Sequence, residues 1–251
     1  VNDLPPKDRD IAMVFENYAL YPHKSIFDNI ANPLKQAKVA KHEIERRVNE
    51  AAKLLEIDHL LNRRPQELSG GQKQRTAIGR AIVRQPQVFL FDEPIAHLDA
   101  KLRARMRSEL KHLQYELGVT TIYVTHDQLE ALTMADRIAV MNDGVLQQFG
   151  TPQEIYENPR TTKVAQITND PAMNLFEGEI VDIHLVLSPT IRLELPPHLA
   201  ALPRGRYTFG IRASGITLDS AGFPFQIELA EISGSETFLH LQHEQVHVVG
   251  L

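Results

Sequence analysis

One short apolar run limits what this chain can fold into. Residues 88–91 (Val-Phe-Leu-Phe) are uninterrupted by polar side chains, and Asp92 and Glu93 follow directly. Such a run is typical of a strand buried on both faces of a parallel sheet. Open α/β sheets bind ligands at the carboxyl ends of their strands. We expect Asp92 to hold Mg²⁺ and Glu93 to act as the general base on an attacking water. A lone acidic pair more often just begins a loop, but the hydrophobic lead-in favours a site.

A second run, residues 119–125, is rich in β-branched side chains and ends at His126. Carboxyl ends of parallel strands meet at one edge of a sheet, so His126 should lie on the same edge as Asp92 and Glu93. Its imidazole can hydrogen-bond a terminal phosphate there. A histidine at the end of a strand is more often structural, and the other histidines lack any comparable context.

A third segment, residues 68–72 (Leu-Ser-Gly-Gly-Gln), precedes an apolar pattern of helical spacing. Ser69 occupies the position of an N-cap. Gly70 and Gly71 leave backbone N–H groups free to approach an anion, which a helix N-terminus attracts. A capped helix after a Gly-Gly turn explains the pentapeptide alone equally well. The acidic strand end that follows favours the anion site.

In this order the three segments resemble the ATP-binding subunit of ABC transporters, with the maltose-type sugar importers most similar. Residues 98–103, 125–128 and 172–174 carry that closer resemblance. The family places Asp92 in the Walker B strand and makes Glu93 the catalytic glutamate and His126 the switch histidine. ATP, with Mg²⁺, would lie between the two subunits of a head-to-tail homodimer. The resemblance assigns nucleotide contacts to the signature motif and the D-loop: Ser69, Gly70, Gly71, Gln72 and Asp99.

The resemblance also covers the Q-loop, residues 14–18, where the family's glutamine is replaced by Glu16. In the family this loop contacts nucleotide and membrane subunits. Two charges about 4 Å apart interact by about 4 kcal/mol at an effective dielectric constant near 20. Glu16 would therefore either repel the γ-phosphate or bind Mg²⁺ more tightly. Both alternatives stay open, and we expect altered coupling to the membrane subunits.

The printed sequence contains no G-x-x-x-x-G-K-[ST] P-loop. The family carries this motif upstream of the Q-loop, so we expect an N-terminal nucleotide-binding region to be missing by truncation or disorder. We also expect the C-terminal end to be incomplete. These residues alone should not hydrolyse ATP, because they lack the lysine and backbone cradle for the phosphates. The alternative is natural loss of the P-loop, which would make the chain a non-catalytic scaffold or regulatory module.

Composition narrows the class of protein further. The net charge is −5, which argues against a nucleic-acid-binding surface. No apolar run approaches the roughly 20 residues that span a bilayer, and no secretory leader is evident. The resemblance implies a peripheral location on the cytoplasmic face of the cell membrane. The implied partners are transmembrane permease subunits and, indirectly, a solute-binding protein, for import of a sugar or polyol.

Two domains are expected. Residues 1–160 should form an α/β core of the P-loop NTPase type that is incomplete at its N-terminus. By the family resemblance this is an ABC ATPase core, with a helical subdomain at about residues 23–85. From about residue 158 short apolar runs replace helices, so residues 161–251 should form an all-β domain. It resembles an oligonucleotide/oligosaccharide-binding (OB)-like regulatory barrel, for which we expect dimer packing first and effector binding second. The expected strands are residues 178–186, 191–195, 207–211, 225–231, 237–241 and 246–249.

Overall fold

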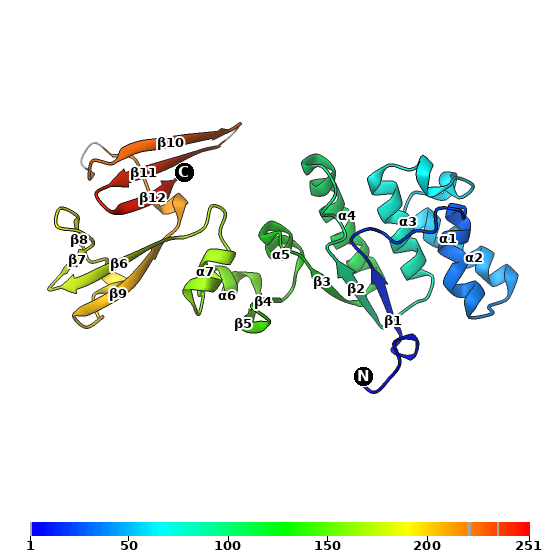
Figure 1. The fold of residues 1–251 in the computed structure, drawn as a ribbon. Helices are drawn as coiled ribbons and strands as arrows, with labels where there is room; N and C mark the ends of the chain where they lie inside the picture. Colours follow the sequence, from blue (N-terminus) through cyan, green and yellow to red (C-terminus); the bar gives the residue numbers. More distant parts are fainter. Residues whose placement is uncertain (1, 220–221, 235) are drawn as a thin grey trace. The chain divides into compact units, whose positions relative to one another are not determined.

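The apolar run at residues 88–91 lies at the centre of a three-stranded parallel sheet (Figure 1). The computed structural model describes residues 2–219, 222–234 and 236–251. Strand β2 (Val88–Asp92) pairs with β1 (Ile11–Val14) on one side and with β3 (Thr120–Val124) on the other. Both of the strands predicted from residues 88–91 and 119–125 are therefore confirmed.

The chain divides into two compact units, Val1–Glu130 and Ala131–Leu251. The three-stranded sheet belongs to the first unit. This division rests on compactness alone, and the boundary at residue 160 stays a prediction. No helix in the described part of the chain is both long and apolar enough to cross a bilayer.

Three helices of the first unit pack together around buried aliphatic side chains. They are α1 (Ile26–Gln36), α2 (Lys41–Leu54) and α3 (Gly70–Ile82). Ile30 and Val48 are fully buried between them. Helix α2 is amphipathic: its Ile44, Val48, Ala51 and Ala52 are buried, whereas Leu54 is exposed. Short 3-10 turns lie before β1, at Pro6–Asp8, and between α2 and α3, at Asp58–Leu60 and Pro65–Glu67.

A buried asparagine fixes the loop that enters α1. Asn29 has no exposed surface, and its Oδ1 accepts a hydrogen bond from the Tyr21 amide at 2.7 Å. Its Nδ2 donates to the carbonyls of Tyr21, Lys24 and Ser25 at 3.1, 3.3 and 2.9 Å. One side chain thus bonds one amide and three carbonyls of the loop and fixes its path into α1.

An arginine ties the bundle to the next helix, α4 (Ala100–Leu117). Arg75 on α3 donates from Nη2 to both carboxylate oxygens of Glu109 at 2.8 and 2.7 Å. Its Nη1 donates to the Leu55 carbonyl at 3.0 Å. Helix α4 ends at Gly118 in the left-handed conformation, which glycine adopts without steric cost.

Near the start of the second unit lies a hairpin whose turn, Asn-Asp-Gly at residues 142–144, is typical of tight hairpin turns. Strands β4 (Ile138–Asn142) and β5 (Val145–Gly150) pair antiparallel. Asp143 and Gly144 in the turn both have positive φ, 49° and 74°, which suits the twist of a tight hairpin. The other helices of the chain are α5 (Gln128–Met134), which runs across the division at residue 130, α6 (Pro152–Glu157) and α7 (Thr162–Ile167).

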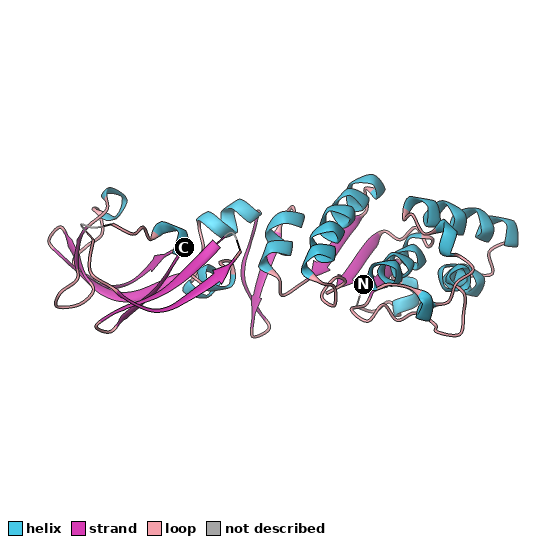
Figure 2. Ribbon diagram, turned by 90° about the horizontal axis from the view of Figure 1, so that it is seen from above, coloured by secondary structure: helices cyan, strands magenta, loops and turns pink. Residues whose placement is uncertain are grey.

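The predicted β-rich character of the C-terminal region is confirmed (Figure 2). One sheet has the order β8-β7-β6-β9 and the other the order β10-β11-β12. In the described residues these sheets remain separate and do not close into a barrel. Their strands are β6 (Asn174–Val181), β7 (His184–Val186), β8 (Arg192–Glu194), β9 (Gly205–Ile211), β10 (Gln226–Ser233), β11 (Glu236–His243) and β12 (Val246–Gly250).

One strand prediction here is wrong. Residues 178–186 were expected to form a single strand, but they form the end of β6, a turn, and β7. Asp182 at the turn has a φ of 55°, and a short polar side chain tolerates this conformation. The apolar residues on either side of Asp182 continue the alternating pattern, which hid the turn.

The two C-terminal sheets share one hydrophobic core. Ile191, next to β8, packs with Leu241, Val246 and Val248 of the three-stranded sheet. Asn174 in β6 bonds both backbone groups of Val249 in β12, at 2.9 and 2.8 Å. The sheets are therefore held face to face by apolar packing and by a polar side chain.

Candidate functional site

The carboxyl ends of β2 and β3 meet, as predicted from the sequence. Asp92 is the register partner of Val124, and the Glu93 amide donates to the Val124 carbonyl at 3.0 Å. Glu93 has a φ of 44°, so the chain turns sharply as it leaves the strand. Both carboxylates and His126 consequently stand at one edge of the sheet.

Glu93 and His126 are in direct contact. Nδ1 of His126 lies 2.9 Å from Oε2 of Glu93. The imidazole is largely exposed, whereas the carboxylate is 29% exposed. The hydrogen bond to Glu93 raises the pKa of His126, and the negative charge of Glu93 adds a smaller effect in the same direction. In this conformation the expected general base therefore has a hydrogen-bond partner before any substrate arrives.

A buried glutamate, missed by the sequence analysis, anchors the strand end beside His126. Glu130 is 3% exposed, and its Oε2 accepts hydrogen bonds from Tyr123 Oη at 3.0 Å and Thr125 Oγ1 at 2.8 Å. Burial, together with the Glu130 charge, raises the pKa of Tyr123, so the phenol stays a donor. No periodic pattern in the sequence singles out Glu130, which lies with Asp127 near the start of α5.

The predicted N-cap of α3 is confirmed. Ser69 Oγ accepts from the Gln72 amide at 3.4 Å, and Gln72 Oε1 accepts from the Ser69 amide at 3.0 Å. The pair forms a capping box. The backbone amides of Gly70 and Gly71 are the first two of the helix, where an intrahelical partner is lacking and the dipole favours an anion.

The two glycines also meet a packing demand from within the chain. A Cβ on Gly70 would lie 3.0 Å from Leu98 Cδ2, and a Cβ on Gly71 would lie 3.5 Å from Leu102 Cδ1. Leu98 is buried. The tip of α3 therefore rests on the turn at residues 95–99, which includes the D-loop that the family resemblance places at residues 96–99, and Gly70 leaves room for that contact.

Hydrogen bonds hold the 95–99 turn in place. Arg103 Nη2 donates to the carbonyls of Ala96 and Leu98, both at 3.2 Å. Asp99 caps α4, because its Oδ1 accepts from the Leu102 amide at 3.0 Å. The structure thus gives Asp99 a capping role, and its nucleotide contact stays a prediction.

Glu16 contacts a residue that the sequence analysis did not single out. Its Oε1 lies 3.3 Å from Nε2 of His97 in the 95–99 turn, and both side chains are about half exposed. The described residues contain no group of three or more histidine or acidic side chains arranged to hold a metal. The one feature of the sequence that hinted at the Glu16–His97 contact was the negative charge of Glu16, which a nearby hydrogen-bond donor stabilises.

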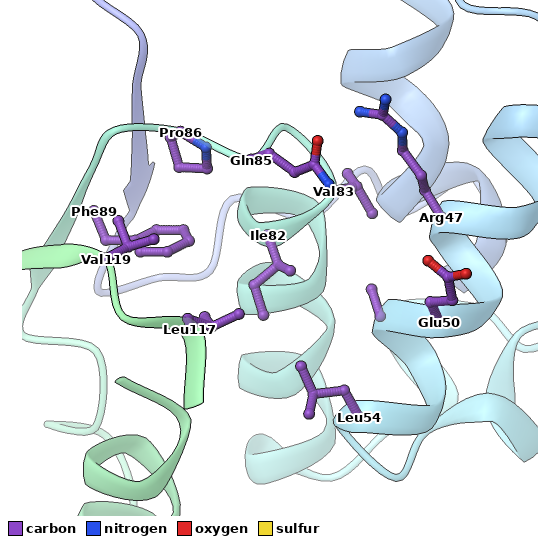
Figure 3. Close-up of a pocket in the computed structure, with 11 residues that line it drawn as sticks. Arg47, Glu50, Leu54, Ile82, Val83, Gln85, Pro86, Phe89, Leu117 and Val119 are labelled. Carbon is purple, nitrogen blue, oxygen red and sulfur yellow. The ribbon is translucent and has the colours of Figure 1, made fainter. Parts of the chain in front are cut away.

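An open pocket of about 410 Å³ lies away from these groups (Figure 3). Pro86, Phe89 and Val119 line it near the starts of β2 and β3, and Ile82 and Leu54 line it from α3 and α2. Because the acidic and histidine side chains stand at the other ends of the strands, the pocket is no part of the candidate site.

Comparison with known proteins decides the family. The family model for ABC transporters matches residues 2–96. The trehalose/maltose import ATP-binding protein MalK of Thermococcus litoralis is 52% identical over 262 residues, which cover 98% of this chain and 70% of the relative. This chain belongs to the family of ABC transporter ATP-binding proteins. The resemblance seen in the sequence is confirmed.

Other ABC transporter proteins are similar over a comparable length. The sn-glycerol-3-phosphate import ATP-binding protein UgpC of Brucella abortus is 51% identical over 248 residues, 96% of this chain and 68% of the relative. The solved structure of cbiO1 from Clostridium perfringens, part of the ABC transporter complex cbiONQ, is 30% identical with a TM-score of 0.55. It covers 63% of this chain and 64% of that one. This ABC ATPase chain thus spans about two thirds of the relatives it matches.

Proposed function

We propose that this chain is part of the ATP-hydrolysing subunit of an importer for a sugar or a polyol compound. The observation that carries the proposal is the contact of Glu93 with His126 at the carboxyl edge of the sheet, 2.9 Å between Oε2 and Nδ1. The edge also carries Asp92. Relatives named for trehalose/maltose and for sn-glycerol-3-phosphate import support the class of solute.

In the proposed reaction Glu93 accepts the proton of the water that attacks the γ-phosphate of ATP. General-base catalysis of this kind is typically worth about 10²–10⁴-fold. His126 donates a hydrogen bond to the terminal phosphate from Nε2, while Nδ1 stays with Glu93. The exposure of the imidazole supports this role, because a phosphate can approach the exposed ring.

The amides of Gly70 and Gly71, with the side chains of Ser69 and Gln72 beside them, would bind the terminal phosphate of an ATP held mainly by the second subunit of a head-to-tail homodimer. The start of α3 supports this assignment, since a helix N-terminus with a glycine backbone suits an anion. Asp99 and Glu16 would face the same nucleotide from the 95–99 turn and the Q-loop.

Asp92 would hold Mg²⁺ together with phosphate oxygens of the substrate. A carboxylate with phosphates and water is a usual ligand set for this ion. The lack of any three-ligand cluster in the described residues fits an ion that depends on the nucleotide. Bound there, Mg²⁺ would offset negative charge on the phosphates. Glu16 would add a ligand only after leaving His97.

The proposed partners are two transmembrane permease subunits, with a solute-binding protein acting through them, at the cytoplasmic face of the membrane. We assign the C-terminal sheets to an OB-like regulatory domain that contributes to the homodimer. The shared core of the two sheets supports this, because an OB-like domain also packs antiparallel strands around a single core.

The test uses the complete gene product with its permease subunits in proteoliposomes. We expect ATP turnover that rises with a sugar or polyol substrate, and a fall of about 10²–10⁴-fold in kcat for Glu93→Gln. ATP binding should survive this substitution. Glu116→Gln, an exposed glutamate on α4, is the matched control. ATP binding and turnover absent from the wild type would instead support a non-catalytic scaffold.

A further inference from the structure

Four contacts link the Q-loop, the 95–99 turn and both ends of α3. The first two hold the Q-loop turn to α3. Arg80 on α3 donates to the carbonyls of Ala19 and Tyr18 at 2.6 and 2.8 Å. Tyr18 and Ala19 both have positive φ, so the turn presents these two carbonyls in an uncommon backbone conformation. Arg80 is well placed to hold that conformation.

The third contact joins the Q-loop to the 95–99 turn. Glu16 precedes the Tyr18–Ala19 pair, and its Oε1 lies 3.3 Å from His97 Nε2. A neutral imidazole with its proton on Nε2 donates to a carboxylate, so the contact does not depend on a charged histidine. Both groups are about half exposed, and burial therefore does not force them together.

The fourth contact returns to α3. Leu98 follows His97, and its Cδ2 lies where it would meet a Cβ on Gly70 at 3.0 Å. Arg103 holds the carbonyls on either side of His97, those of Ala96 and Leu98. A displacement of His97 is therefore passed directly to the leucine against the tip of α3.

We propose that His97 is a positioning residue that locks the Q-loop to the tip of the signature helix through Glu16. Arg80 and Gly70 are on the same helix, so the Glu16–His97 contact closes a ring that begins and ends on α3. His97 also gives Glu16, the carboxylate that replaces the family's glutamine, a hydrogen-bond donor. This donor lowers the repulsion between Glu16 and a phosphate. This inference rests on the proposed ATPase function of the same site.

The activity test is a double-mutant cycle in the complete gene product. His97→Ala should lower kcat about threefold, the size expected for an exposed pair, with less change in KM for ATP. In a Glu16→Ala background His97→Ala should have no further effect. His97→Gln, which keeps a donor, should restore part of the loss. Independent, multiplying effects of the two single substitutions would overturn the proposal.

The structural test is hydrogen exchange in the same protein without nucleotide. The amides of Tyr18 and Leu98 bond within the two linked turns, to Phe15 and Ile95. His97→Ala should speed exchange at both amides, by about threefold. Unchanged exchange at Tyr18 would overturn the link. This readout needs no turnover, so it tests the ring even where the ATPase proposal itself fails.

The matched control is His112→Ala on α4. His112 Nε2 lies 3.2 Å from Glu116 Oε1, and the imidazole is 72% exposed. It forms a similar histidine–glutamate pair outside the ring. This substitution should change neither kcat nor the exchange of Tyr18 and Leu98. An equal effect of both histidine substitutions would show a general loss of stability and would overturn the role of His97.

Discussion

Replacing Arg75 with alanine should loosen the signature helix far more than replacing another arginine with as many ionic contacts. Arg75 donates to both oxygens of Glu109 and to the Leu55 carbonyl, and its side chain is only 15% exposed. Arg46 on α2 also bonds two glutamates, at 2.7 and 2.8 Å, but it is 53% exposed. The two residues separate the effect of burial from the number of contacts.

The magnitude follows from what each substitution leaves behind. Removing one member of a fully buried ion pair costs about 3–5 kcal/mol, because the other charge stays buried. Glu109 is 31% exposed and keeps a second partner, Arg105 Nε at 2.7 Å, and both facts reduce this penalty. The Leu55 carbonyl loses its bond to the guanidinium, at about 1–3 kcal/mol for a buried group. We expect a net loss of about 2–3 kcal/mol for Arg75→Ala, on the scale of these effects.

Urea unfolding followed by far-ultraviolet circular dichroism measures this loss. With a slope of about 2 kcal/mol per molar urea, the midpoint for Arg75→Ala should fall by about 1–1.5 M. Arg46→Ala should lower the midpoint by no more than about 0.5 M, because each of its exposed pairs within α2 is worth only about 0.3–0.5 kcal/mol. The midpoint of Arg75→Lys should lie between those of the wild type and Arg75→Ala. Lysine keeps the positive charge but lacks the planar guanidinium that bonds both oxygens of Glu109. Equal midpoints for the two alanine variants would refute the argument from burial.

Three further predictions concern other parts of the structure. Asn29→Ala should destabilise the first unit by about 2–3 kcal/mol, since it strips partners from buried backbone groups, whereas the exposed Asn49→Ala should have little effect in the same urea assay. Gly178→Ala should cost about 1–2 kcal/mol in thermal unfolding, because its Cβ would lie 2.8 Å from Leu185 Cδ1; an unchanged melting temperature would contradict this. Glu43 should titrate by NMR with a pKa of about 2 against 4.5 when unpaired, because arginines on its helix donate to it. Its stabilising effect is then complete above pH 4.5 and is lost as the pH falls toward 2; a midpoint near 4.5 would contradict the pairing.

Local chemistry made part of the site predictable. The apolar run before Asp92 and the serine before two glycines each specify a backbone conformation within a few residues. The strand and the cap therefore formed where the sequence placed them. The shared edge of β2 and β3 followed from the rule that parallel strands present their carboxyl ends together.

Pairs between distant segments were not predictable in this way. Glu16 with His97, and Arg75 with Glu109, join side chains whose own neighbourhoods show no periodic signal. The turn at Asp182 was hidden because alternating polarity continues across it. Closure of the C-terminal sheets depends on which strand edges pair, and hydrophobic alternation within each strand does not encode that choice.

The contact of Gly70 with Leu98 changes how a familiar experiment must be interpreted. A bulkier residue at position 70 pushes on the leucine as well as approaching the phosphate, so lost turnover in Gly70→Ala has two causes that look alike. Replacing Leu98 with a smaller residue in the same variant separates the two causes. Activity returns if crowding of Leu98 caused the loss, and it stays absent if the nucleotide itself is displaced. Conclusions about phosphate recognition drawn from the single substitution would therefore be confounded in this protein.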